Sequence, residues 1–220
     1  MPRIARLILP NNPHHITQRG NYQQKVFKAE IDYSYYAALL KKYAMRYAVS
    51  IIAFCLMPNH VHFICVPSNE DSLANTFKIT HTTYSQYLNR KDNIKGHLWQ
   101  GRFFSSILDE KYLYAAVRYV ENNPVRAGLV EKPWDWKWSS VRTHVRGEPC
   151  GVPLIDVSQF MQVEKWEDYL TDLQDEQLAK IVMKNTLLGK PSGNSDFIDR
   201  LEGILKIKLT QSKKGRPFKK

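Results

Sequence analysis

Stretches of alternating or continuous apolar residues mark short strands in the first half of the chain, separated by turn residues. The strands that this pattern predicts are 13–19, Val49–Met57, His60–Val66 and His97–Leu108. Because only Pro58-Asn59 separates the second strand from the third, these two are predicted to form a hairpin. Gly101 predicts a bend within the fourth strand.

Apolar residues at helical spacing predict helices between these strands and after them. The predicted helices are 31–47, 72–89, 110–123, 167–188 and 196–207. The third is expected to end at Asn123, because Pro124 follows and has no N–H to donate. The order β-α-β-β-α-β-α predicts an α+β fold, with helices packed on an antiparallel sheet of ferredoxin-like type.

Composition indicates more about the cellular setting of the protein than about its chemical activity. Of the 220 residues, 43% are hydrophobic, which is enough for a buried core. Cys55, Cys65 and Cys150 are odd in number and lack C-x-x-C spacing, which argues against a disulfide framework or a thiolate zinc site. No apolar run has transmembrane length and no signal-peptide pattern opens the chain, so we expect a soluble, cytoplasmic protein.

Charge is distributed unevenly along the chain. Residues 1–145 carry a formal charge of +9, residues 146–205 carry −5 and residues 206–220 carry +7, which together give +11. We expect one domain over 1–145 and a helical extension with a basic, disordered tail over 146–220. The charge favours a polyanion partner, although solubility alone would also explain it. Within the tail, Lys213, Lys214 and Arg216 are expected to add salt-sensitive affinity for a polyanion such as DNA.

His60 and His62 form the strongest candidate site. Side chains alternate along a strand, so these two imidazoles point to the same face and Val61 points to the other. Neutral imidazole is a common metal ligand, and two of them leave a site that needs a third ligand. Two half-buried structural histidines remain an alternative.

The third predicted helix offers that ligand and a nucleophile. Tyr119 and Asn123 lie one turn apart on one face, next to the apolar stripe of Leu113, Val117 and Val120. The Asn123 oxygen is a hard ligand that suits Mg²⁺ or Mn²⁺. By position alone, an amphipathic boundary residue is the better explanation of Tyr119, one of twelve tyrosines, and Asn123 is a common residue of a helix end.

Five motifs, in the order in which they occur along the chain, carry a resemblance to a known protein family. They are HHITQRGN (14–21), LMPNHVHF (56–63), LWQGRFFSS (98–106), RYVENNPVRAG (118–128) and WKWSS (136–140). Together they resemble the REP-associated tyrosine transposases, a branch of the single-tyrosine HUH nucleases. The resemblance covers about the first two-thirds of the chain and implies that residues 1–145 form the catalytic domain, with an RRM-like HUH fold.

The resemblance also implies roles for the candidate residues. His60 and His62 would be the HUH metal ligands, Tyr119 the nucleophile, and Asn123 would stand where insertion-sequence enzymes place a Gln as third ligand. The cofactor would be Mg²⁺ or Mn²⁺. The substrate would be single-stranded DNA beside a REP-type hairpin, cut through a 5′-phosphotyrosine and rejoined. The branch is expected to act as a monomer that associates with the nucleoid.

Several arginines within the matching motifs are candidate DNA contacts. They are Arg19, Arg102, Arg118 and Arg126, and each is equally suited to an ion pair or a solvated surface. Trp99, Phe103 and Phe104 are candidates for stacking on bases, with core packing favoured for at least two of them. A hairpin-binding protein without catalysis is the alternative function, and a water-using metal hydrolase is a third.

Overall fold

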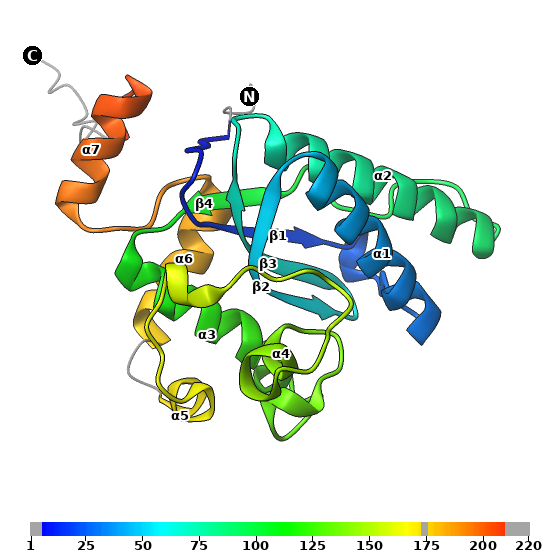
Figure 1. Ribbon diagram of the computed structural model, residues 1–220. Coiled ribbons are helices and arrows are strands. Elements are labelled where there is room, and N and C mark those ends of the chain that lie inside the picture. Colours follow the sequence, from blue (N-terminus) through cyan, green and yellow to red (C-terminus); the bar gives the residue numbers. More distant parts are fainter. Residues whose placement is uncertain (1–5, 173–175, 210–220) are drawn as a thin grey trace, which may run out of the picture.

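A four-stranded antiparallel sheet lies at the centre of the protein, whose computed structural model describes residues 6–172 and 176–209 (Figure 1). The strands are β1 (His14–Arg19), β2 (Val49–Met57), β3 (His60–Pro67) and β4 (Phe104–Ile107). They are arranged in the order β2-β3-β1-β4, with all neighbours antiparallel. The α+β prediction and the β2–β3 hairpin are therefore confirmed.

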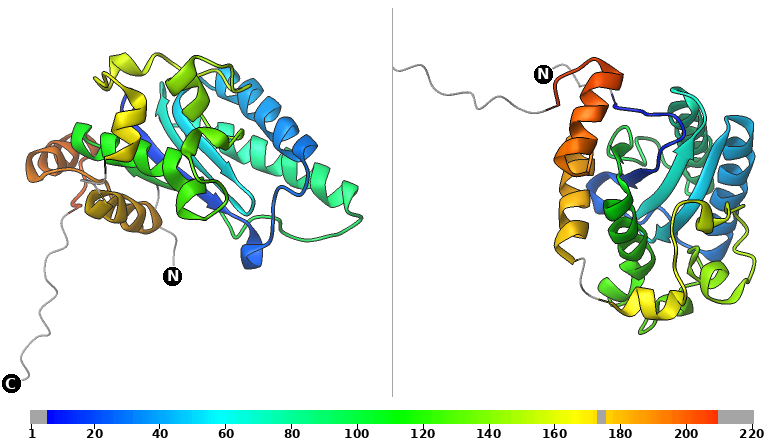
Figure 2. Two further views of the ribbon diagram at one scale, coloured as in Figure 1. Left: turned by 90° about the horizontal axis from the view of Figure 1, so that it is seen from below. Right: turned by 60° about the vertical axis from the view of Figure 1, so that its left-hand side comes forward.

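Helices cover both faces of the sheet (Figures 1 and 2). They are α1 (Glu30–Arg46), α2 (Ser72–Lys91), α3 (Glu110–Arg126), α4 (Val141–Arg146), α5 (Trp166–Thr171), α6 (Glu176–Leu188) and α7 (Ser195–Leu205), with short 3-10 turns at Asn21–Gln23, Pro133–Asp135 and Val157–Gln159. The pair α1 and α2 lies on one face, and α3 lies on the other with α6 beside it. Within the described residues, none of the helices has the length and apolar character that crossing a membrane requires.

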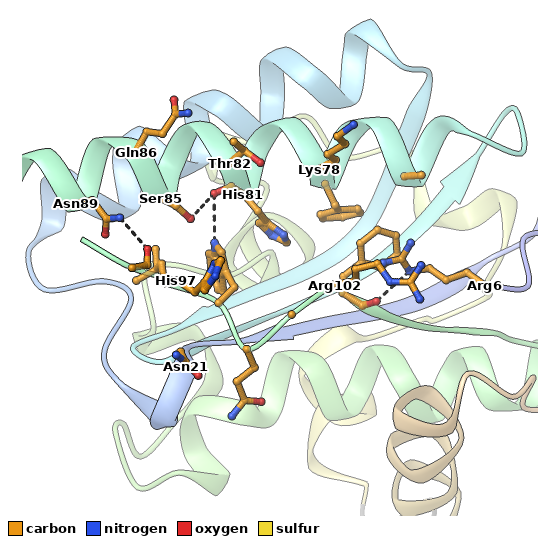
Figure 3. A pocket seen from close by; sticks show the side chains of 18 residues that line it. Arg6, Asn21, Lys78, His81, Thr82, Ser85, Gln86, Asn89, His97 and Arg102 are labelled. Carbon is orange, nitrogen blue, oxygen red and sulfur yellow. Dashed lines mark hydrogen bonds between the residues drawn. The ribbon is translucent and has the colours of Figure 1, made fainter. Parts of the chain in front are cut away.

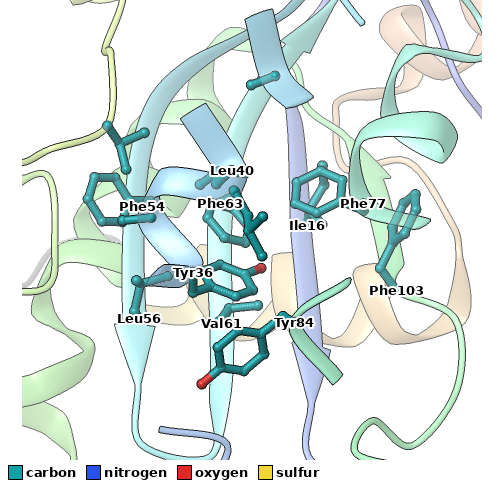
Figure 4. Close-up of a cluster of buried hydrophobic side chains, with 14 of the residues drawn as sticks. Ile16, Tyr36, Leu40, Phe54, Leu56, Val61, Phe63, Phe77, Tyr84 and Phe103 are labelled. Atoms are coloured by element: carbon teal, nitrogen blue, oxygen red, sulfur yellow. The ribbon is translucent and has the colours of Figure 1, made fainter. Parts of the chain in front are cut away.

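The alternation of side chains along the strands builds a separate core on each face. One core joins sheet residues to α1 and α2; Figure 4 shows Ile16, Val61 and Phe63 of the sheet with Tyr36, Leu40, Phe77 and Tyr84 of the helices. The second core packs residues such as Ile64 and Met57 against α3. Each large apolar side chain that is fully buried contributes roughly 1.5–3 kcal/mol.

Strand register brings polar residues of β1 beside the histidines of β3. Thr17 pairs with His62 and Arg19 pairs with His60 in the antiparallel ladder. Because Val61 is buried in the core below α1 and α2, His60 and His62 lie on the opposite, α3-covered face. This is the shared face that the alternation predicts.

The predicted strand over His97–Leu108 was too long. Only Phe104–Ile107 forms a strand, and the residues before it run irregularly along the end of β1. Trp99 and Phe103 are buried in the core under α2, with relative exposures of 7% and 6%. Because these side chains pack there, their segment does not continue the strand. Phe104 is 41% exposed, which agrees with core packing for two of these three aromatics.

The prediction that Pro124 ends the third helix was wrong. Helix α3 continues through Pro124 to Arg126, and the Asn123 carbonyl accepts a hydrogen bond from the Ala127 N–H at 3.0 Å. A proline in the last turn removes only its own N–H from the helix, and this proline is buried. Its burial and the remaining bonds keep the turn helical.

The prediction of a single helix over 167–188 is also wrong. Helix α5 ends at Thr171, and Asp172 has extended backbone angles. The carbonyls of the last turn are bound by α3 instead, because Arg118 Nε donates to Tyr169 O at 2.6 Å and Asn122 Nδ2 donates to Leu170 O at 2.8 Å. The chain resumes as α6, which packs along α3.

Candidate active site

His60 and His62 meet directly after the Pro58-Asn59 turn. Their ring centroids are 4.9 Å apart and the rings are perpendicular. His62 is 1% exposed, whereas His60 is half-buried at the edge of the site. The pair therefore has one imidazole anchored in the protein and one that borders solvent.

Both rings have their Nδ1 atoms engaged by other residues. His60 Nδ1 lies 2.6 Å from Asn59 Oδ1, and His62 Nδ1 lies 3.0 Å from His15 Nε2. An imidazole held at one nitrogen has its ring orientation fixed and its other nitrogen left for a ligand. The two Nε2 atoms are thus the candidate donors of this site.

Burial keeps both histidines in the neutral form. Removal from water, followed by the positive charge of Arg19, lowers the pKa of His60 to about 4, and the Asn123 side chain partly opposes this by hydrogen bonding to His60. The pKa of His62 is also well below its ordinary value, because of burial first and then of His60, His15 and Arg19. Neutral imidazole is the form that ligates a metal.

Helix α3 places Tyr119 and Asn123 over the same pair of histidines. The Tyr119 ring meets His62 edge to face, with centroids 5.7 Å apart. Asn123 is 7% exposed, its Nδ2 lies 3.5 Å from the Tyr119 carbonyl oxygen, and its side chain hydrogen bonds to His60. The structure therefore brings together all four residues that the sequence singled out.

The donor set can hold a divalent cation. Among residues 6–172 and 176–209, no three or more His, Cys, Asp or Glu side chains form a metal-binding group. The described donors here are two neutral imidazoles and the Asn123 amide, which together supply nitrogen and oxygen ligands for a divalent cation and leave further positions open to substrate or water. This set is compatible with the metal that the HUH resemblance implies.

Sequence reasoning missed two residues behind the site. His15 of β1 stacks on His62 with ring centroids 5.2 Å apart, and its Nδ1 lies 2.7 Å from Thr186 Oγ1 of α6. The alternation of His15, Thr17 and Arg19 was a signal for the first of these. No signal in the sequence pointed to Thr186, which lies 171 positions away.

The candidate arginines occupy three different environments. Arg19 is exposed beside His60, and the Arg126 guanidinium lies 5.3 Å from the Tyr119 ring centroid while forming a 2.9 Å ion pair with Glu176. Arg118 packs over the Tyr169 ring and is only 13% exposed in its side chain. Arg102 lies elsewhere, on the α2 side. Lys213, Lys214 and Arg216 fall outside the described residues.

Arg102 belongs to a groove between α2 and the segment 96–103 (Figure 3). The groove has a volume of about 930 Å³ and is lined by cationic, amide and aromatic side chains. Arg6, which the sequence did not single out, lies beside Arg102 there, and its guanidinium stacks 3.8 Å from the Phe103 ring centroid. Burial and then the nearby Arg102 lower the pKa of Arg6 to about 10. Two adjacent guanidinium groups favour an anionic ligand.

The match to a family of known proteins identifies the chain as a tyrosine transposase. The family described as "Transposase IS200 like" matches residues 10–123, more than half of the 220 residues, and the chain belongs to that family. It is accordingly an enzyme of DNA strand cleavage and transfer. The resemblance to REP-associated tyrosine transposases is confirmed.

Two relatives illustrate this similarity. A Haemophilus influenzae protein, whose name assigns it to the REP-associated tyrosine transposases, is 29% identical over 119 residues, covering 49% of this chain and 68% of that protein. The solved structure of a REP-associated tyrosine transposase bound to a REP hairpin superposes with a TM-score of 0.58 at 20% identity. It covers 74% of this chain and 99% of the other, and it supports the fold.

Proposed function

We propose that this protein cleaves and rejoins single-stranded DNA beside REP-type hairpins through a 5′-phosphotyrosine on Tyr119. The observation that carries the proposal is the edge-to-face contact of Tyr119 with His62, at 5.7 Å between ring centroids. It puts a nucleophile next to a candidate metal ligand. The relatives named for REP elements support hairpin DNA as the substrate.

We infer that the site holds Mg²⁺ or Mn²⁺ through His60, His62 and Asn123. Such an ion supplies Lewis-acid polarisation of the scissile phosphate when bound. His15 and Asn59 hold the two imidazoles from behind, so the ligands need little reorganisation.

The chain's own residues account for the transfer step. Tyr119 Oη forms a bond to phosphorus, and the bond between phosphorus and the 3′ oxygen breaks. The phenol gives up its proton and the leaving oxygen takes one up, which yields a free 3′-OH. Arg19, exposed beside His60, is placed to offset the phosphate charge. Because the phosphotyrosyl bond conserves the phosphodiester energy, a second 3′-OH reverses the step and joins strands.

The DNA path that we infer runs from the groove at α2 to the histidines. Asn21 lines the groove and its N–H bonds to Leu98 O at 2.8 Å, and Gln100 N–H bonds to Arg19 O at 3.0 Å. The groove therefore begins within two residues of Arg19. Arg6 and Arg102 would bind phosphates there, while Arg19 would bind them at the site.

We infer that one chain suffices for catalysis. Tyr119 contacts His62 of its own chain, so no exchange of α3 between subunits is needed to assemble the site. A mixture of Tyr119→Phe and His60→Ala proteins should therefore form no more adduct than His60→Ala protein alone. Adduct formation above that level in the mixture would indicate that two chains share a site.

The deciding experiment uses hairpin DNA labelled at its 3′ end, with Mn²⁺ or Mg²⁺, on a denaturing protein gel. We expect a labelled covalent adduct that is lost in Tyr119→Phe and weakened in His60→Ala. The matched control is Tyr112→Phe, since Tyr112 is a half-buried tyrosine of the same helix. Cleavage that survives Tyr119→Phe would indicate a water-using hydrolase, and binding without cleavage would indicate a non-catalytic hairpin binder.

A further inference from the structure

A buried hydrogen-bond chain runs from α6 through the sheet to the candidate metal site. Thr186 Oγ1 lies 2.7 Å from His15 Nδ1, and His15 Nε2 lies 3.0 Å from His62 Nδ1. Thr186 and His15 are fully buried and His62 is 1% exposed. Solvent therefore does not compete for these bonds, and each proton in the chain has a protein partner.

The direction of donation along this hydrogen-bond chain follows from counting protons. The Thr186 hydroxyl has a single proton, which it donates to Val182 O at 2.7 Å. It must then accept from His15 Nδ1–H. His15 is fully buried, and its two nitrogens meet a hydroxyl and an imidazole rather than a carboxylate, so the ring is neutral and carries one N–H only. With its proton on Nδ1, His15 accepts at Nε2 from His62 Nδ1–H.

We propose that Thr186 and His15 are positioning residues that hold His62 in the tautomer with a bare Nε2 atom, the form that binds a metal. The reverse direction would put a proton on His62 Nε2 and would leave Val182 O without the hydroxyl donor. The inference rests on the proposed function for its metal, but the tautomer is a property of the metal-free protein.

The proposal assigns a role to the region after the family match. The match ends at residue 123, and Thr186 lies in α6, which packs against α3, β4 and β1. The right-hand view of Figure 2 shows α6 beside β1 and α3. The C-terminal region would thus complete the back of the active site rather than serve only to bind DNA.

The first test measures histidine tautomers in the full-length, metal-free protein by long-range ¹H–¹⁵N NMR. We expect the Nδ1–H form at both His15 and His62, with resonances assigned by single substitutions of other histidines. An Nε2–H form at His62 in the wild type would overturn the proposal. The tautomers are measured in the wild-type protein and the variants serve only to assign its resonances, so a folding defect in one variant does not change the result.

The second test compares Mn²⁺ affinities by calorimetry. Thr186→Val removes the acceptor for His15 and should weaken Mn²⁺ binding about 10-fold, the lower end of the range for loss of an outer-sphere partner, because Thr186 acts on His62 through His15. Thr186→Ser keeps the hydroxyl and should restore wild-type affinity. Thr80→Val is the matched control, because Thr80 is a buried threonine of α2 whose Oγ1 has no hydrogen-bond partner.

The outcomes separate this inference from the proposed function. Wild-type protein that fails to bind Mn²⁺ would contradict the proposed metal site, while the tautomer measurement would still decide the hydrogen-bond chain. Wild-type binding that Thr186→Val leaves unchanged would overturn the positioning role alone. Equal losses in Thr186→Val and Thr80→Val would show a general packing effect and would also overturn it.

Discussion

The guanidinium of Arg126 lies 5.3 Å from the centre of the Tyr119 ring, seven residues earlier on α3. The contact exists because the helix continues past Pro124 and brings Arg126 back to the same face two turns later. Glu176 of α6 holds the other side of the guanidinium at 2.9 Å. The proposed nucleophile is therefore held between His62 and a cation that α6 helps to orient.

Arg126→Ala should slow formation of the covalent adduct without abolishing it. A cation–π contact at a partly exposed site contributes about 0.5–1 kcal/mol, which corresponds to a rate loss of roughly 2- to 5-fold if it positions the ring. The measurement is the single-turnover rate of adduct formation. Glu176→Gln, which keeps the arginine, should lose less, and an unchanged rate in Arg126→Ala would exclude a positioning role.

Arg102 should contribute to DNA binding through charge, whereas Arg118 should not. Arg102→Ala is expected to reduce the slope of log K against log salt by about one, as for loss of one phosphate contact. Arg118→Ala is the matched control, because its guanidinium bonds to Tyr169 O and lies 3.7 Å from the Asp172 carboxylate. Fluorescence anisotropy with hairpin DNA in a Tyr119→Phe background measures both slopes, and equal slopes would contradict the proposed groove.

Glu121 should be a stability residue rather than a catalytic one. This fully buried carboxylate of α3 accepts hydrogen bonds from Ser140 Oγ at 2.5 Å, His144 Nδ1 at 2.7 Å and Trp166 Nε1 at 2.6 Å. Glu121→Leu leaves three donors without their acceptor and should cost about 3 kcal/mol of unfolding free energy. Urea unfolding measures the loss; Glu164→Gln, at an exposed position, should change it little.

The free energy of unfolding should fall as the pH drops below about 6.5, which is the ordinary pKa of a histidine side chain. Burial lowers the pKa of His14 to about 4 and that of His81 to about 3, so the unfolded chain takes up these protons first. Each group contributes stability that is complete above pH 6.5 and is lost towards its folded pKa, at up to about 1.4 kcal/mol per pH unit.

Urea midpoints at pH 7 and pH 5 test this dependence. His81→Gln should reduce the difference between the two midpoints, because one buried histidine no longer opposes protonation. His97→Gln, at an exposed histidine, should leave the difference unchanged. A midpoint that does not fall between pH 7 and pH 5 would contradict the prediction.

Local periodicity accounts for the parts of the site that were predictable. The two-residue repeat of a strand places His60 and His62 on one face, and the helical repeat places Tyr119 and Asn123 on one face. Both relations are set by backbone geometry within a few residues. Apolar periodicity likewise gave the bounds of β2 to the residue and those of α1 to within one residue.

Contacts between distant segments decided the rest, since no local repeat encodes them. Burial of Trp99 and Phe103 shortened β4, and packing of α3 kept Pro124 within the helix. The alignment of α6 with β1 brought Thr186 to His15, across 171 positions. The sequence by itself determined which residues share a face. The tertiary structure decided which faces meet, because that depends on how the two cores pack and on which buried polar groups can satisfy one another.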